Sequence, residues 1–172
     1  AKFLESETYF EGNRDAWSAL EEAYKAGKLR DIGLSNFEKA DVDNILASCS
    51  VEPMVNQILA HISNTPKELI QYNQDKGILV EAYSPFGHGE LFKNQDVAAI
   101  AANYKVSVSQ LAIRYCLQLD LLPLPKTANP EHMKTNAEVD FVISDEDMEF
   151  LENVEPIEDY GAHSKFPVFG KK

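Results

Sequence analysis

Four short apolar segments alternate with longer amphipathic segments along this chain of 172 residues, and this order constrains the fold more than any other feature. The apolar segments cover residues 29–34, 54–58, 78–83 and 121–125, and apolar residues at helical spacing separate them. Parallel strands of one sheet are joined by crossover connections, which are usually helices and are right-handed. The chain therefore predicts a parallel α/β fold with about four βα units.

Capping residues and glycines predict where the helices begin and end. Residues 1–14 show no sustained period and predict a loop, whereas a helix is expected from Asp15 to the stop at Gly27. Ser35 and Glu38 have the capping-box spacing that opens a helix. The other predicted helices are 66–76, 95–104, 108–119 with a capping box of Ser107 and Gln110, one that starts at Asn129-Pro130, and one from Ser144 to near Val154.

Composition narrows the class of protein. No linker of Gly, Ser and Pro divides the chain, so residues 1–172 are expected to form a single domain, with 155–172 as an irregular tail in which Tyr160, Phe166, Val168 and Phe169 are docking points. A formal net charge of −12 disfavours nucleic acid as a partner. No apolar run approaches the roughly 18–20 residues that span a bilayer, and the N-terminus lacks a secretory signal. We expect a soluble, cytoplasmic protein with no membrane partner.

Polar motifs follow all four predicted strands, and together they carry a resemblance. In this order and with these spacings they resemble the aldo-keto reductases; the motifs are Gly33–Phe37, Val55–Gln57, Ala82–Gly87 and Leu124–Glu131. The resemblance implies a (β/α)8 TIM barrel with its chemistry at the C-terminal ends of the strands, this chain supplying the second half. It also implies hydride transfer from a reduced nicotinamide to the carbonyl carbon of a small-molecule aldehyde or ketone.

The family's catalytic tetrad of Asp, Tyr, Lys and His has no matching motif in residues 1–172. We therefore expect no catalytic residue in this chain, the tetrad upstream of Ala1, and no activity of the chain in isolation. Four parallel strands cannot close a barrel, and open edges invite pairing. The sequence thus predicts self-association, or pairing with an N-terminal half.

The resemblance assigns the nicotinamide end of a cofactor to the first three motifs. Tyr83 matches the aromatic residue on which the nicotinamide ring stacks. Ser35, Asn36 and Gln57 match the residues that hydrogen-bond its carboxamide, a task for neutral donors and acceptors. For Ser35 a plain helix cap with Glu38 is the alternative interpretation.

The resemblance assigns the phosphate groups of the cofactor to the last two motifs. Ser84, Phe86 and the Gly87-His88-Gly89 turn match the loop that covers the pyrophosphate. Lys126 and Thr127 match the pair that holds the adenosine 2′-phosphate. Further along, Asn136 fits the family pattern, but His132 stands where the family commonly has Arg. The Lys126 and Thr127 pair makes NADP(H) the expected cofactor. A neutral imidazole cannot replace the charged guanidinium fork, which weakens this preference and leaves NAD(H) as the alternative.

Rival interpretations remain open at this point. The histidines lie on separate segments, and the acidic residues of 138–159 lack the spacing of a calcium loop, so no metal site is expected. Cys49 and Cys116 form no CxxC motif and are expected to stay reduced. A non-catalytic nucleotide-binding accessory module and an inactive fragment of a reductase are the alternatives to an oxidoreductase. The leading hypothesis requires the four strand ends to grip one dinucleotide.

Overall fold

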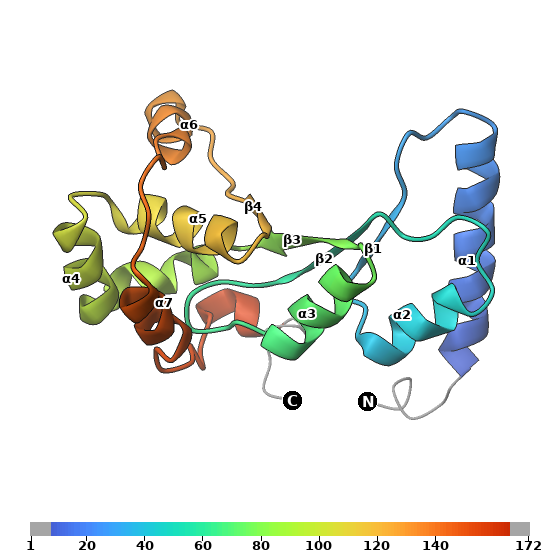
Figure 1. Ribbon diagram of the computed structural model, residues 1–172, viewed down its shortest axis with the longest axis horizontal. Coiled ribbons are helices and arrows are strands. Elements are labelled where there is room, and N and C mark those ends of the chain that lie inside the picture. Colours follow the sequence, from blue (N-terminus) through green and yellow to red (C-terminus); the bar gives the residue numbers. More distant parts are fainter. Residues whose placement is uncertain (1–7, 166–172) are drawn as a thin grey trace. The chain divides into compact units, whose positions relative to one another are not determined.

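The computed structural model describes residues 8–165, which fall into two compact units. The first unit contains residues 8–57 and 68–79, and the second contains residues 58–67 and 80–165. Helices alternate with short strands along the chain (Figure 1). The single domain over 1–172 stays a prediction.

The first unit is built from helices around a pair of parallel strands. Strand β1 pairs in parallel with β2, with Gly33 opposite Val55 and Ser35 opposite Gln57. Helix α1 packs against α2. The elements that contribute to this unit are α1 (Thr8–Lys25), β1 (Gly33–Ser35), α2 (Lys39–Leu46), β2 (Val55–Leu59) and α3 (Lys67–Asp75).

A cluster of buried apolar side chains forms the core of the first unit. Trp17 of α1, Leu34 of β1 and Ile45 of α2 all belong to it and are at most 7% exposed. The indole Nε1–H of Trp17 donates a hydrogen bond to the carbonyl of Val51 at 3.0 Å. The polar atom of the largest core side chain is therefore satisfied inside the unit.

Strand β1 begins at a glycine because the backbone of β2 comes very close there. A Cβ on Gly33 would lie 2.2 Å from Cγ2 and 2.9 Å from the carbonyl oxygen of Val55. Any other residue would push the two strands apart. The glycine thus permits the parallel pairing that sets Ser35 beside Gln57.

The second unit repeats the alternation with a parallel pair of its own. Strand β3 pairs in parallel with β4, and Tyr83 lies opposite Leu124. Helix α5 packs against α4, α6 and β4. The elements are β3 (Leu79–Tyr83), η1 (Gly87–Lys93), α4 (Gln95–Asn103), α5 (Val108–Gln118), β4 (Leu122–Leu124), α6 (Pro130–Ala137), α7 (Asp145–Glu152) and η2 (Gly161–Lys165). Parallel strands alternating with helices confirm the α/β prediction.

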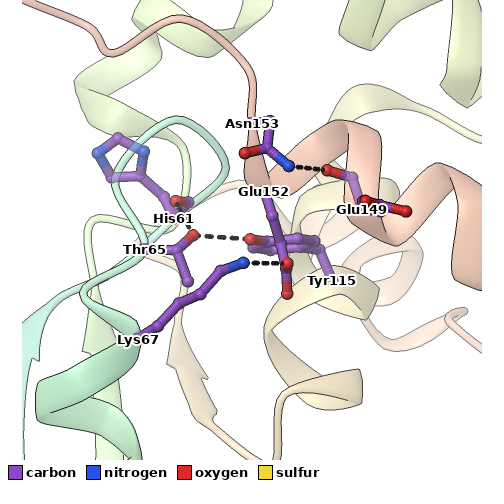
Figure 2. A network of polar contacts seen from close by, with 7 residues as sticks. All are labelled: His61, Thr65, Lys67, Tyr115, Glu149, Glu152 and Asn153. Carbon is purple, nitrogen blue, oxygen red and sulfur yellow. Dashed lines mark hydrogen bonds and ion pairs between the residues drawn. The ribbon is translucent and has the colours of Figure 1, made fainter.

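A polar network in the second unit joins α5, α7 and the start of α3 (Figure 2). The hydroxyl of Tyr115 lies 2.7 Å from Oγ1 of Thr65, whose own hydroxyl donates to the carbonyl of His61 at 3.2 Å. Lys67 forms an ion pair with Glu152, but its side chain is 57% exposed. An exposed pair contributes little to stability, so the partly buried Tyr115–Thr65 contact is the stronger link.

The first helix begins earlier than the sequence predicts. Residues 8–14, expected to be a loop, form the first turns of α1. Tertiary contacts hold these turns: Nδ2 of Asn44 donates to the carbonyl of Phe10 at 3.1 Å, and Arg14 hydrogen-bonds Asn44 as well. No local period signals such contacts, because their partner lies on another helix.

The capping box of Ser35 and Glu38 is also wrong. Glu38 is itself the N-cap of α2, and the box forms between Glu38 and Asp41. Ser35 remains in β1, opposite Gln57. The interpretation of Ser35 as a helix cap therefore falls away, which leaves its side chain available for another role.

The tail contains one docked residue among those that the structure describes. Tyr160 is 6% exposed, as expected of a docking point, and η2 follows it. Phe166, Val168 and Phe169 lie outside the described residues. Within residues 8–165, no helix has both the length and the apolar character needed to cross a membrane.

Candidate functional site

Three of the expected site residues lie together where β1 and β2 end in the first unit. Ser35 and Gln57 are register partners, and the backbone N–H of Asn36 donates to the carbonyl of Gln57 at 2.9 Å. Nδ2 of Asn36 donates to Oγ of Ser35 at 3.1 Å. Ser35 and Asn36 are exposed, and Gln57 is partly exposed. The carboxyl ends of these strands thus present neutral donors and acceptors to solvent.

Two expected site residues have a left-handed backbone directly after a strand. Asn36 follows β1 with φ 57°, and Ser84 follows β3 with φ 51°. Residues other than glycine adopt this conformation at a cost, and such positions cluster at functional sites. The turn continues at His88, with φ 54°. Both turns therefore place a non-glycine residue in the left-handed conformation directly after a strand.

A cavity of about 410 Å³ lies in the second unit between the turn after β3 and the end of β4. It brings together three expected site residues, Ser84, Phe86 and Lys126. The other lining residues are Pro85, His88, Gly89, Phe92 and Leu124. Oγ of Ser84 lies 3.1 Å from Nε2 of His88. His88 and Gly89 belong to the Gly87-His88-Gly89 turn that the resemblance assigns to the pyrophosphate, and both line the cavity.

The residues expected at the 2′-phosphate are divided by the structure. Lys126 lines the cavity, whereas Thr127, His132 and Asn136 are not among its lining residues. Oγ1 of Thr127 accepts a hydrogen bond from the backbone N–H of Asn129 at 3.1 Å. Asn129 is the N-cap of α6 and bonds the first turn through its side chain. The N-terminus of this helix therefore lies shortly after Lys126 and Thr127 in the chain. Such a terminus favours anions.

Tyr83 ends β3 and keeps its phenol neutral. Burial, followed by the neighbouring Tyr160, raises the pKa of Tyr83 to about 12. The hydroxyl therefore carries its proton throughout the physiological range. A neutral, partly exposed ring at a strand end is suited to stacking against another planar group.

Histidines from distant segments lie near the turn that follows β3, and their contacts were not predicted from the sequence. His61 is 1% exposed, and its Nε2 lies 3.1 Å from the hydroxyl of Tyr160. Its Nδ1 contacts the carbonyl of Ile62, so the proton sits on Nδ1 and Nε2 accepts from the tyrosine. The ring of His88 stacks on His163 with centroids 3.9 Å apart. Contacts between segments this distant in the chain leave no local pattern.

Acid is expected to destabilise the chain through His61. Burial, and then the charge of His88, lowers the pKa of His61, against an opposing contribution from the Ile62 carbonyl. Below about pH 6.5, the ordinary pKa of histidine, His61 takes up a proton in the unfolded chain but stays neutral in the folded chain. The contribution of neutral His61 to stability is therefore fully present above about pH 6.5. It is lost as the pH falls from there toward the lowered pKa of His61 in the folded chain.

Thermal unfolding between pH 7.5 and 5.5, followed by circular dichroism, measures this effect. We expect the melting temperature to fall with pH in the native chain and to fall less in His61→Gln, whose amide can accept from Tyr160. His132→Gln, at an exposed position on α6, serves as the control. An equal pH dependence in native chain and His61→Gln would contradict this prediction.

Two further expectations concern metal binding and the state of the two cysteines. Among residues 8–165, no group of three or more His, Cys, Asp or Glu side chains is arranged to hold a metal ion. Cys116 is buried and Cys49 partly exposed, and both are free thiols. Burial raises the pKa of Cys116 to about 12, so this thiol is an inert part of the core.

Comparison with known proteins gives a consistent family. The family model described as "Aldo/keto reductase family" matches residues 6–156. An uncharacterized oxidoreductase of Schizosaccharomyces pombe is 44% identical over 148 residues, which are 85% of this chain and 53% of that protein. Glyoxal reductase of Bacillus subtilis is 39% identical over 140 residues, 81% of this chain and 51% of the enzyme. The chain spans about half the length of the curated relatives it matches.

Solved structures agree. An aldo-keto reductase from a deep-sea metagenome library has a TM-score of 0.81 at 29% identity, covering 85% of this chain and 55% of that one. Aldose reductase of Schistosoma japonicum has a TM-score of 0.78 at 34% identity, covering 83% and 47%. An aldo-keto reductase, AKR2E5, complexed with NADPH has a TM-score of 0.77 at 31% identity, covering 81% and 46%. The chain belongs to the aldo/keto reductase family.

Proposed function

We propose that this chain carries the cofactor-binding part of an NADPH-dependent reductase that converts an aldehyde or ketone to an alcohol. The observation that carries the proposal is the cavity of the second unit, in which Lys126 lines the same space as Ser84 and Phe86. A lysine ammonium, a serine hydroxyl and a glycine-bearing turn suit phosphate oxygens. The AKR2E5 structure complexed with NADPH and the likeness to glyoxal reductase support this function.

In this proposal the strand ends bind the nicotinamide. Ser35, Asn36 and Gln57 of the first unit hydrogen-bond the carboxamide, which offers one acceptor and two donors. Tyr83 of the second unit supplies a neutral ring face for stacking. Stacking leaves the other face of the nicotinamide open to the substrate.

The phosphates fall to the second unit. Ser84 and Phe86 cover the pyrophosphate, while Lys126 and Thr127, with the N-terminus of α6, hold the 2′-phosphate. His132 and Asn136 lie further along α6 and complete this group. The lysine gives NADPH its advantage over NADH, because only the former carries the 2′-phosphate.

The chemistry divides between cofactor and protein. The bound nicotinamide supplies a hydride to the carbonyl carbon, and a protein acid must deliver a proton to the carbonyl oxygen. We assign none of the residues described above to that acid. The chain by itself is therefore expected to bind NADPH without reducing aldehydes.

Calorimetric titration of NADPH into the full 172-residue chain tests the cofactor assignment. Saturable binding at one site per chain is the expected result, and a folded sample that releases no heat of binding would remove the proposal. Incubating the chain with NADPH and a panel of aldehydes, while following the absorbance of the reduced nicotinamide, tests the second part. Turnover would show that the chain contains a catalytic acid after all.

Lys126→Ala is expected to weaken NADPH binding by about 10- to 100-fold, since a hydrogen bond to a charged group contributes about 1.5–3 kcal/mol. Binding of NADH should change by less than about threefold, because it makes no 2′-phosphate contact. Lys28→Ala removes another exposed lysine charge, in the first unit, and is the control. Equal losses for the two cofactors would refute the assignment of Lys126.

A further inference from the structure

Two buried asparagines lie beneath the turn that follows β1. Asn56 and Asn73 are both 0% exposed. Asn56 lies in the middle of β2, and Asn73 lies on the face of α3 that also buries Ile70. A buried amide is costly unless its polar atoms find partners, so their contacts show what the pair does.

Asn56 hydrogen-bonds the backbone of the turn that follows β1. Its Nδ2 donates to the backbone carbonyl of Phe37 at 2.9 Å and to Oδ1 of Asn73 at 3.2 Å. Asn73 is held in turn, since its Nδ2 donates to the carbonyl of Leu69 at 2.7 Å. A chain of hydrogen bonds thus runs from helix α3 through β2 to the residue that follows Asn36.

Stability alone does not favour an amide at position 56. Oδ1 of Asn56 is buried and has no hydrogen-bond partner among the described residues. An apolar side chain of similar size would avoid this cost. What the amide provides is its donor, which points at the carbonyl of Phe37.

The same strand also carries a residue of the proposed site. Successive side chains of a strand point to opposite faces, so Asn56 is buried while Gln57 is partly exposed. Asn36, left-handed at φ 57°, lies between the strand end and the carbonyl that Asn56 binds. Fixing that carbonyl fixes where Ser35 and Asn36 present their side chains.

We infer that Asn56, supported by Asn73, is a positioning residue that holds the Ser35–Phe37 turn in the conformation needed to bind the nicotinamide carboxamide. The inference rests on the proposed function for its ligand, whereas the contact with the turn is independent of it. Neither asparagine is assigned a contact with the cofactor. Both act through the backbone of the turn.

The test compares NADPH with a fragment that lacks the nicotinamide, adenosine 2′,5′-bisphosphate, in calorimetric titrations of the full chain. Asn56→Ala is expected to raise the Kd for NADPH about tenfold, since one misplaced hydrogen bond is worth a factor of this order. The Kd for the fragment should stay within about twofold, because the fragment has no carboxamide. Ile78→Val, which trims the core of the same unit, controls for general destabilisation.

Asn73→Leu is the second variant, for the case that Asn56→Ala does not fold. It removes the support but leaves Asn56 able to donate to Phe37, so a smaller loss of NADPH affinity is expected with the fragment again unaffected. Equal losses for NADPH and the fragment, or losses no larger than those of Ile78→Val, would overturn the inference.

Amide hydrogen exchange in the cofactor-free chain tests the positioning role of Asn56 separately from cofactor binding. The N–H of Asn36, bonded to Gln57, should exchange faster in Asn56→Ala than in Ile78→Val. Unchanged exchange would overturn the positioning role by itself. A native chain that does not bind NADPH but shows the faster exchange on mutation would sink the proposed function and leave the hold on the turn supported.

Discussion

Replacing Trp17 with alanine is expected to lower the free energy of unfolding by about 3–5 kcal/mol, the usual cost of deleting a buried aromatic ring. Trp17 is 4% exposed and packs in one cluster with Leu34 of β1 and Ile78. The change also removes the indole donor from the carbonyl of Val51. A typical domain has only about 5–15 kcal/mol of stability, so a large part of it would be lost.

Urea unfolding followed by far-ultraviolet circular dichroism measures this loss. Trp17→Phe keeps a ring in the core but loses the indole N–H, and it should cost about 1–2 kcal/mol. Trp17 is the single tryptophan of the chain, so its fluorescence in the native protein reports on the first unit. A loss below about 1 kcal/mol for the alanine variant would show that the unit does not depend on this cluster.

Local chemistry was enough to predict most helix starts. Ser107 caps α5 with the expected box to Gln110, and Asn129 and Ser144 cap α6 and α7. In each case the capping side chain bonds backbone groups within three residues. Signals of that range are visible in a sequence without knowledge of the fold, and the order of strands and helices followed from the equally local pattern of apolar residues.

Contacts between distant segments account for the errors at the start of the chain. Residues 8–14 are helical although they lack a period, because Asn44 of α2 bonds Phe10 and Arg14. Ser35 has the correct spacing for a cap, but pairing with Gln57 keeps it in β1. In both places a tertiary partner decided the outcome, and a local pattern does not show that partner.

The candidate site divides in the same way. Ser84 and Lys126 were predicted from motifs, and the cavity of the second unit brings them together. That all the strand ends bind one dinucleotide stays a prediction. His61 and Tyr160 lie 99 positions apart, so neither could be assigned to the other beforehand. Asn73 carried a faint signal, an amide three residues after Ile70 on an apolar helix face.

Replacing Tyr115 with alanine is expected to lower the free energy of unfolding by about 3–5 kcal/mol, because the ring is as deeply buried as any in the chain's described part. Tyr115 is 1% exposed and lies on α5. Burial raises the pKa of its phenol, which therefore stays protonated and donates to Thr65. The variant loses both the packing of the ring and this link in the network of Figure 2.

Tyr115→Phe separates packing from hydrogen bonding, since it keeps the ring and removes only the hydroxyl. It should cost about 0.5–1.5 kcal/mol, the net value of one hydrogen bond. Glu152→Gln, which weakens the exposed ion pair with Lys67, should cost less than about 1 kcal/mol. Urea unfolding of the three variants gives the order alanine, phenylalanine, glutamine in decreasing loss. If Glu152→Gln cost as much as Tyr115→Ala, the ion pair and not the buried ring would hold α5 and α7 in place.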